Sequence, residues 1–223
     1  MPKVSEEYFE NKRRKIVDAA YQVCLRKPVE MVTMMDVIEE TGLSQGGIYR
    51  FYNDLDEILA DMITGMRSDY NIISQVEEKI SQPDNDSFEK IVHSVCDILA
   101  DVMEEHLMDI QKINFDLTVL AINEPERAEK IIGKTRGKSN MEYLGRVVLP
   151  MFAKSFEQKK LKPHGNPEDI MKFISAAYVG IETDCILSAC YGKAPMNSIS
   201  EPHALFDMLA KTIILLFGGN END

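Results

Sequence analysis

Apolar residues recur at intervals of three and four along most of the chain, the spacing that gathers them on one face of an α-helix. Gly and Pro are few and fall between these segments, where they mark breaks. The pattern predicts helices over residues 6–27, 34–41, 45–51, 55–80, 87–107, 109–122, 126–159, 167–191 and 203–217. We therefore predict an all-α fold of about nine helices. Residues 212–217 are rich enough in β-branched side chains to suit a strand, but a lone strand would have no partner.

The lengths of the predicted helices change near residue 54. One helix and two very short ones precede this point, and long amphipathic or apolar helices follow it. This arrangement predicts a small helix-turn-helix domain over residues 1–54 and a larger helical domain over residues 55–223.

The segment from residue 33 to residue 52 has the features of a helix-turn-helix. Thr33 and Asp36 have the spacing of a capping box, which predicts a helix starting at residue 34. Gly42 suits the positive φ of a tight turn, Leu43 would fill the angle between two helices, and Ser44 would cap the second helix.

The second short helix should have distinct inner and outer faces. Ile48 and Tyr52, four residues apart, should face the core. The outward positions offer an amide, a phenol and a guanidinium, all suited to base edges or phosphates: Gln45, Gly46, Tyr49 and Arg50. Adjacent glycines cost about 1 kcal/mol each in a helix, so their presence favours close approach of another backbone, either DNA or a neighbouring protein segment.

The negative net charge of the chain means that any contact with DNA must depend on a local cluster of basic residues. The chain has 25 Lys and Arg against 37 Asp and Glu, a net charge of −12, which on average repels nucleic acid. Residues 1–60 hold eight basic against eleven acidic side chains. The four basic residues from Lys12 to Lys15 concentrate positive charge in one helical turn, and we predict phosphate contacts from Lys12 and Arg13 beside those of Thr33, Ser44 and Tyr49. Gln45 and Arg50 are the predicted base contacts.

Four segments, in their order and spacing, resemble the TetR family of bacterial transcriptional regulators: Arg14–Ala20, Thr33–Ser44, Gly46–Tyr52 and Glu57–Leu59. The resemblance covers roughly the first 60 residues, and the remainder matches only in its helix pattern. It implies a three-helix DNA-binding domain, a helical ligand-binding and dimerisation domain, and repression that a small molecule relieves.

Four residues depart from the family pattern. Pro28 replaces a glycine after the first helix, and Ile38 replaces a small residue in the second. Phe51 stands where His or Tyr is frequent, and Leu55 where a phosphate-binding Lys is frequent. These departures sustain an alternative, a helical ligand-binding or adaptor protein that keeps the helix-turn-helix without binding DNA specifically.

Residues 173–191 are apolar around most of the helix, which indicates burial on more than one side. With the last predicted helix they offer more apolar surface than a monomer readily buries, so we predict a homodimer through these two helices. The same faces could instead pack within one chain. The predicted interface residues are Ala177, Gly180, Asp184, Leu209 and Ile213.

Small-molecule pockets combine apolar bulk with isolated polar groups. The helices after residue 87 offer such a set: Met103, His106, Asn114, Phe115, Thr118, Met141, Tyr178 and Glu182. Glu182 lies four residues after Tyr178 on an otherwise apolar helix, which favours a lipophilic effector of positive charge. Pairing of Glu182 with a basic residue of the same chain, such as Arg146, is the alternative.

Several classes of protein lack support in the sequence. The cysteines Cys24, Cys96, Cys185 and Cys190 are scattered and contain no C-x-x-C pair, so neither a disulfide scaffold nor a zinc site is expected. We find no phosphate-binding loop, nucleophile elbow or kinase signature, and we expect neither an enzyme nor a cofactor. The longest apolar run has five residues and the amino terminus is charged, so we expect no membrane span and a cytoplasmic location.

Overall fold

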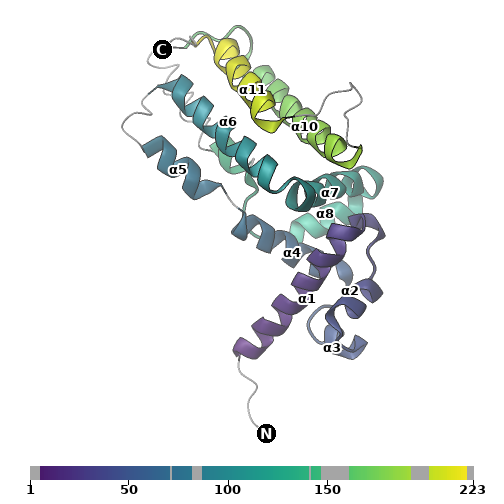
Figure 1. The fold of residues 1–223 in the computed structure, drawn as a ribbon. Coiled ribbons are helices and arrows are strands. Elements are labelled where there is room, and N and C mark those ends of the chain that lie inside the picture. Colours follow the sequence, from purple (N-terminus) through teal and green to yellow (C-terminus); the bar gives the residue numbers. More distant parts are fainter. Residues whose placement is uncertain are drawn as a thin grey trace. The chain divides into compact units, whose positions relative to one another are not determined.

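The computed structural model describes residues 6–70, 72–81, 87–140, 142–146, 161–191 and 201–219 (Figure 1). Within these residues there is no strand, and the all-α prediction is confirmed. The described helices are α1 Glu6–Arg26, α2 Met34–Thr41, α3 Gln45–Tyr49, α4 Leu55–Asp69, α5 Ile73–Ser81, α6 Phe88–Glu105, α7 Lys112–Asn123, α8 Pro125–Lys134, α10 Pro167–Tyr191 and α11 Pro202–Phe217, with a 3-10 turn at Val29–Met31 and a π turn at Leu107–Gln111.

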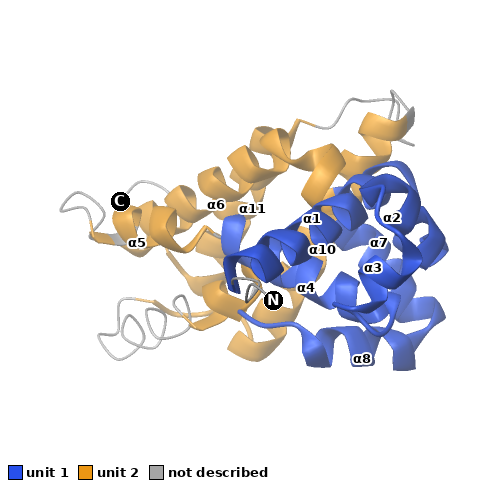
Figure 2. Ribbon diagram, turned by 90° about the horizontal axis from the view of Figure 1, so that it is seen from below, with its two compact units in different colours: residues 1–70, 112–137 blue, residues 71–111, 138–223 orange. Residues whose placement is uncertain are grey.

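The chain forms two compact units that do not divide at residue 54 (Figure 2). Unit 1 contains residues 1–70 and 112–137, and unit 2 contains residues 71–111 and 138–223. Helices α4, α7 and α8 belong with the helix-turn-helix because α4 packs against α1 and α8, while α7 packs against the 3-10 turn after α1. The division of function at residue 54 stays a prediction.

Unit 1 is built around apolar side chains from each of its first four helices. Ile16 of α1, Val37 of α2, Ile48 of α3 and Leu59 of α4 are fully buried. Each such side chain stabilises the fold by about 1.5–3 kcal/mol relative to an exposed position. This shared core fixes the position of α3, which is too short to be stable alone.

Unit 2 is centred on α6, α10 and α11, with α11 packed along α6 and α10 (Figure 1). Its core includes Met103 of α6 with Phe206, Ile214 and Phe217 of α11. The segment 212–217 is therefore helical, and its β-branched residues pack in the core.

Three predicted helices differ from the observed ones. The span 55–80 is interrupted at Tyr70, whose backbone (φ −117°, ψ 31°) ends α4 without any Gly or Pro. The span 109–122 begins instead with the π turn, in which the Gln111 N–H donates to the His106 carbonyl. The span 126–159 is broken after α8, because Thr135 is extended (ψ 136°) and Gly137 has a positive φ (+79°). Residues 140 and 142–146 are again helical, and residues 147–159 lie outside the described residues.

Helix α10 is more apolar than the count of consecutive apolar residues indicates. In the described chain its residues 167–190 are long and apolar enough to span a membrane by length and composition alone, with a mean hydropathy of 1.3. Apolar helices at protein interfaces meet the same criterion. Only 17% of that window is buried, so α10 presents an extensive apolar surface outside its unit.

Candidate DNA-binding surface and effector cavity

The helix-turn-helix has the local geometry that the sequence predicts. The Thr33 hydroxyl accepts a hydrogen bond from the Asp36 N–H at 3.2 Å, and the Asp36 carboxylate accepts from the Thr33 N–H at 2.7 Å. Gly42 adopts the left-handed conformation (φ +65°) at the turn. Ser44 caps α3 by accepting from the Gly47 N–H at 3.2 Å. The predicted caps and turn are confirmed.

Helix α3 buries one face and exposes the other. Ile48 and Tyr52 are buried, as predicted, and the four outward side chains are exposed: Gln45, Gly46, Tyr49 and Arg50. Among the described residues, no atom lies within 4 Å of a Cβ built on Gly46. Packing within the protein therefore does not explain the absence of a side chain at Gly46, whereas approach of an external backbone would.

Aromatic side chains join the start of α1 to the end of α3. The rings of Phe9 and Phe51 lie 5.8 Å apart, and the Arg50 guanidinium lies 5.3 Å from the centre of the Phe9 ring. Phe51, the departure from the family pattern, thus packs against α1. A cation above an aromatic face is held by about 0.5–1 kcal/mol at an exposed site, so Arg50 is restrained but can still leave the ring.

Arg13, predicted to contact phosphate, is engaged within unit 1. Its guanidinium donates to the Phe51 carbonyl at 3.2 Å and pairs with Asp61 at 3.3 Å. The guanidinium also covers the Tyr52 ring, and the Tyr52 hydroxyl donates to Asp61 at 2.9 Å. These contacts tie α1 and α4 to the end of α3, so the structure favours a positioning role for Arg13. Its predicted phosphate contact is untested.

The other basic residues in this turn of α1 are not held by ion pairs among the described residues, so they are available to contact phosphate. Arg14 and Lys15 are exposed, and the Lys12 ammonium lies 5.5 Å from the centre of the Tyr8 ring. Lys12 lies one turn after Phe9, which itself packs against Phe51. Positive charge on α1 therefore lies near the exposed end of α3.

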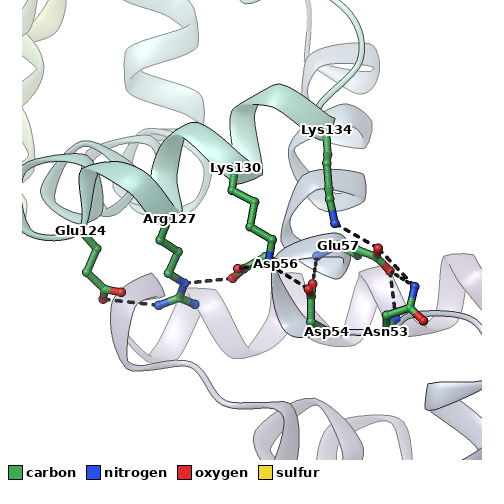
Figure 3. Close-up of polar contacts among 8 residues, drawn as sticks. All are labelled: Asn53, Asp54, Asp56, Glu57, Glu124, Arg127, Lys130 and Lys134. Carbon is green, nitrogen blue, oxygen red and sulfur yellow. Dashed lines mark hydrogen bonds and ion pairs between the residues drawn. The ribbon is translucent and has the colours of Figure 1, made fainter.

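A set of ion pairs joins α8 to the start of α4 (Figure 3). The basic residues lie three and four positions apart on one face of α8, and their partners cluster at the amino terminus of α4. Arg127 binds Asp56 at 2.9 Å, Lys130 binds Asp54 at 2.9 Å and Asp56 at 3.1 Å, and Lys134 binds Glu57 at 3.0 Å. We call this set the α8–α4 clamp.

The clamp compensates for the acidic sequence around Leu55, where the family frequently has Lys. Asp54 also caps α4 through the Glu57 N–H, and the Asn53 N–H together with Lys134 lowers the pKa of Glu57. Glu57 therefore stays ionised and paired with Lys134. The clamp is not predictable from local sequence, because the basic residues of α8 and their acidic partners lie more than 70 residues apart.

Unit 2 contains a cavity of about 390 Å³. Its described lining comes from α6, from residues 142–145, from α10 and from α11: Phe88, Ile91, Val92, Val95, Cys96, Leu99, Glu142, Leu144, Gly145, Met171, Ile174, Ser175, Tyr178, Leu209 and Ile213. The volume falls within the range of about 300–1,000 Å³ found for small-molecule sites.

The structure brings one of the predicted ligand residues, Tyr178, to this cavity. Met103 is buried in the core, and His106 ends α6 with its ring 3.2 Å from Asp109. Glu182 lies on α10 without lining the cavity. Three of the predicted ligand residues lie on α7 in unit 1: Asn114, Phe115 and Thr118. Met141 lies outside the described residues.

The predicted dimer residues divide between the two sides of their helices. Leu209 and Ile213 are buried in unit 2 and line the cavity, so the structure favours a core role for both, and their place in a dimer interface stays a prediction. Ala177 packs against the core, Asp184 is half-buried, and Gly180 is exposed. The large exposed apolar residues of these helices are Phe173 and Val179 on α10, and Met208 and Leu215 on α11.

Comparison with known proteins relates the chain to bacterial regulators. No family model matches it. It is 25% identical over 213 residues to the uncharacterized HTH-type transcriptional regulator YfiR of Bacillus subtilis (strain 168), an alignment that covers 92% of this chain and 94% of that protein. A solved structure from Mesorhizobium loti MAFF303099, assigned to the TetR family of transcriptional regulators, has a similar fold: TM-score 0.62, 14% identity, and coverage of 94% of this chain and 98% of that one.

Proposed function

We propose that this chain, a TetR-family transcriptional regulator, acts as a homodimeric repressor that binds a pseudo-palindromic operator and is released by a small lipophilic effector. In this proposal Gln45 and Arg50 contact bases, while Thr33, Ser44, Tyr49 and Lys12 contact phosphates. Phosphate contacts supply most of the affinity and base contacts supply the specificity. A cytoplasmic location belongs to the same proposal.

The observation that carries the proposal is the outer face of α3. Its side chains include a guanidinium, a phenol and an amide, all exposed, and they surround a glycine with no described neighbour within 4 Å of its Cβ position. Thr33 and Ser44 mark the starts of α2 and α3, and the positive end of a helix dipole favours anions there. An exposed face of this kind suits a DNA groove better than a protein core.

DNA binding can be measured by fluorescence anisotropy on a labelled pool of random-sequence duplexes at increasing salt. We expect binding at 50 mM salt that weakens steeply as salt rises, because phosphate contacts release counterions. Lys12→Gln should weaken binding to the whole pool and lower the salt slope by about one. Lys172→Gln, which removes an exposed charge from α10 in unit 2, is the matched control and should leave both quantities unchanged.

Absence of binding at 50 mM salt would support the alternative, a helical ligand-binding or adaptor protein that does not use its helix-turn-helix on DNA. The charge of the first 60 residues is the observation that favours this alternative, with eight basic against eleven acidic side chains. The α8–α4 clamp argues against it, because the basic residues of α8 neutralise three of those acids.

A further inference from the structure

The cavity in unit 2 has walls that are informative about its occupant. Residues of α6, α10 and α11 surround about 390 Å³ with mostly hydrocarbon side chains. The cavity is partly open to solvent, and its described walls offer few partners for the hydrogen bonds of water. An apolar occupant would cover these walls and displace that water.

Few polar side chains occur among the described lining residues of the cavity: Cys96, Glu142, Ser175 and Tyr178. Among the described lining residues none is Lys, Arg, His or Asp. Glu142 is exposed, and its carboxylate accepts a hydrogen bond from the Ser139 N–H at 2.8 Å. Burial raises the pKa of Cys96 to about 12, and burial together with the nearby Glu182 raises the pKa of Tyr178. Both groups are therefore neutral at physiological pH.

A charged effector would lose hydration in this cavity and would find no oppositely charged partner that is both buried and fully ionised among the described lining residues. Removing an ionised group from water costs several kcal/mol unless an opposite charge or several hydrogen bonds compensate. An anion meets no cationic side chain among the described walls. A cation would need Glu182, which lies one turn beyond Tyr178 and outside the lining, and burial raises the pKa of Glu182 to about 7, so that much of it is neutral.

We propose that the cavity binds an uncharged, largely hydrocarbon effector and that the Tyr178 hydroxyl forms its main hydrogen bond. This inference rests on the proposed function for the regulatory role of the site, and it replaces the cationic effector that the sequence favours. Tyr178 is suited to the role because it lines the cavity and its ring packs edge-to-face against the Phe206 ring, with the ring centres 6.0 Å apart. This contact restrains the orientation of the Tyr178 side chain.

The inference is tested with three ten-carbon probes whose head groups are neutral, anionic and cationic. Thermal unfolding of the full-length protein is followed with 1-decanol, decanoate and decyltrimethylammonium at equal concentrations below micelle formation. A ligand that binds only the folded state raises the unfolding temperature, and the rise grows with the ratio of the free ligand concentration to the dissociation constant. We expect 1-decanol to stabilise the protein and each ion to need at least about tenfold higher concentration for the same shift.

Two variants assign the site. Ile174→Trp fills the cavity from α10 and should abolish the rise in unfolding temperature caused by 1-decanol. If this variant folds poorly, Ile91→Phe fills the cavity from α6 and serves the same purpose. Lys172→Trp, at an exposed position of the same helix, is the matched control and should keep the shift. Tyr178→Phe should reduce the stabilisation by 1-decanol and should leave the stabilisation by decane, which has no hydroxyl group, unchanged.

Stabilisation by decyltrimethylammonium or decanoate equal to that by 1-decanol would overturn the inference. So would stabilisation by none of the three probes, or a full shift by 1-decanol in both cavity-filling variants. Each of these outcomes leaves the proposed function intact if the wild-type protein binds DNA in the absence of probe. Absence of DNA binding would overturn the proposed function instead.

Discussion

Replacing Leu215 with Arg should convert the protein into monomers and lower its affinity for a two-half-site operator by at least about a hundredfold. Leu215 is 62% exposed on the outer face of α11, two helical turns after the exposed Met208. If that face joins α10 and α11 of two chains, the variant buries an unpaired charge at a cost of about 3–5 kcal/mol. Light scattering at micromolar concentration gives the mass, and anisotropy gives the affinity.

The choice of Leu215 follows from the two-sided burial of α11. Arg at Leu209 or Ile213 would enter the core of unit 2, so loss of a dimer could not be separated from unfolding. Ile122→Arg is the matched control, because Ile122 is 74% exposed on α7 in unit 1. A wild-type protein that is monomeric at micromolar concentration, or a Leu215→Arg variant that remains dimeric, would refute the predicted interface.

Replacing Gly46 with Ala should lower DNA affinity by about tenfold or more while leaving the free energy of unfolding unchanged or slightly raised. The added methyl group meets no described atom within 4 Å, and Ala is favoured over Gly in a helix by up to about 1 kcal/mol. On DNA the same methyl group would occupy the space of an approaching backbone. Urea unfolding and anisotropy separate the two effects.

Gly65→Ala supplies the control for this substitution. Gly65 lies inside α4, and a Cβ there also has no described neighbour within 4 Å. We expect the Gly65→Ala variant to match Gly46→Ala in stability and the wild-type protein in DNA affinity. Equal DNA affinity in the Gly46→Ala variant and the wild-type protein would remove the main support for DNA binding through α3.

Local signals in the sequence were sufficient for the helix-turn-helix. The capping box at Thr33, the left-handed Gly42 and the cap at Ser44 each depend on residues within four positions, and all three were predicted. The bounds of α10 were also predicted, because Pro167 and Gly192 flank it. Such features depend little on the rest of the fold.

Features that depend on tertiary structure were missed. Helix α11 is apolar on both faces, so periodicity could not tell the buried Leu209 from the exposed Leu215. The end of α4 at Tyr70 has no Gly or Pro to mark it. The cavity depends on which faces of α6, α10 and α11 meet, and residues chosen for their polarity alone, such as His106 and Glu182, lie outside its lining.

The most direct test of the account is selection of binding sites from random duplexes by the purified protein at low salt. The account predicts an inverted repeat whose half-sites are centred about one helical turn apart, about 34–36 Å, because a symmetric dimer presents two α3 helices to successive major grooves. It also predicts that Arg50→Ala relaxes the preference at matching positions in both halves. Failure of the wild-type protein to enrich any inverted repeat would contradict the account.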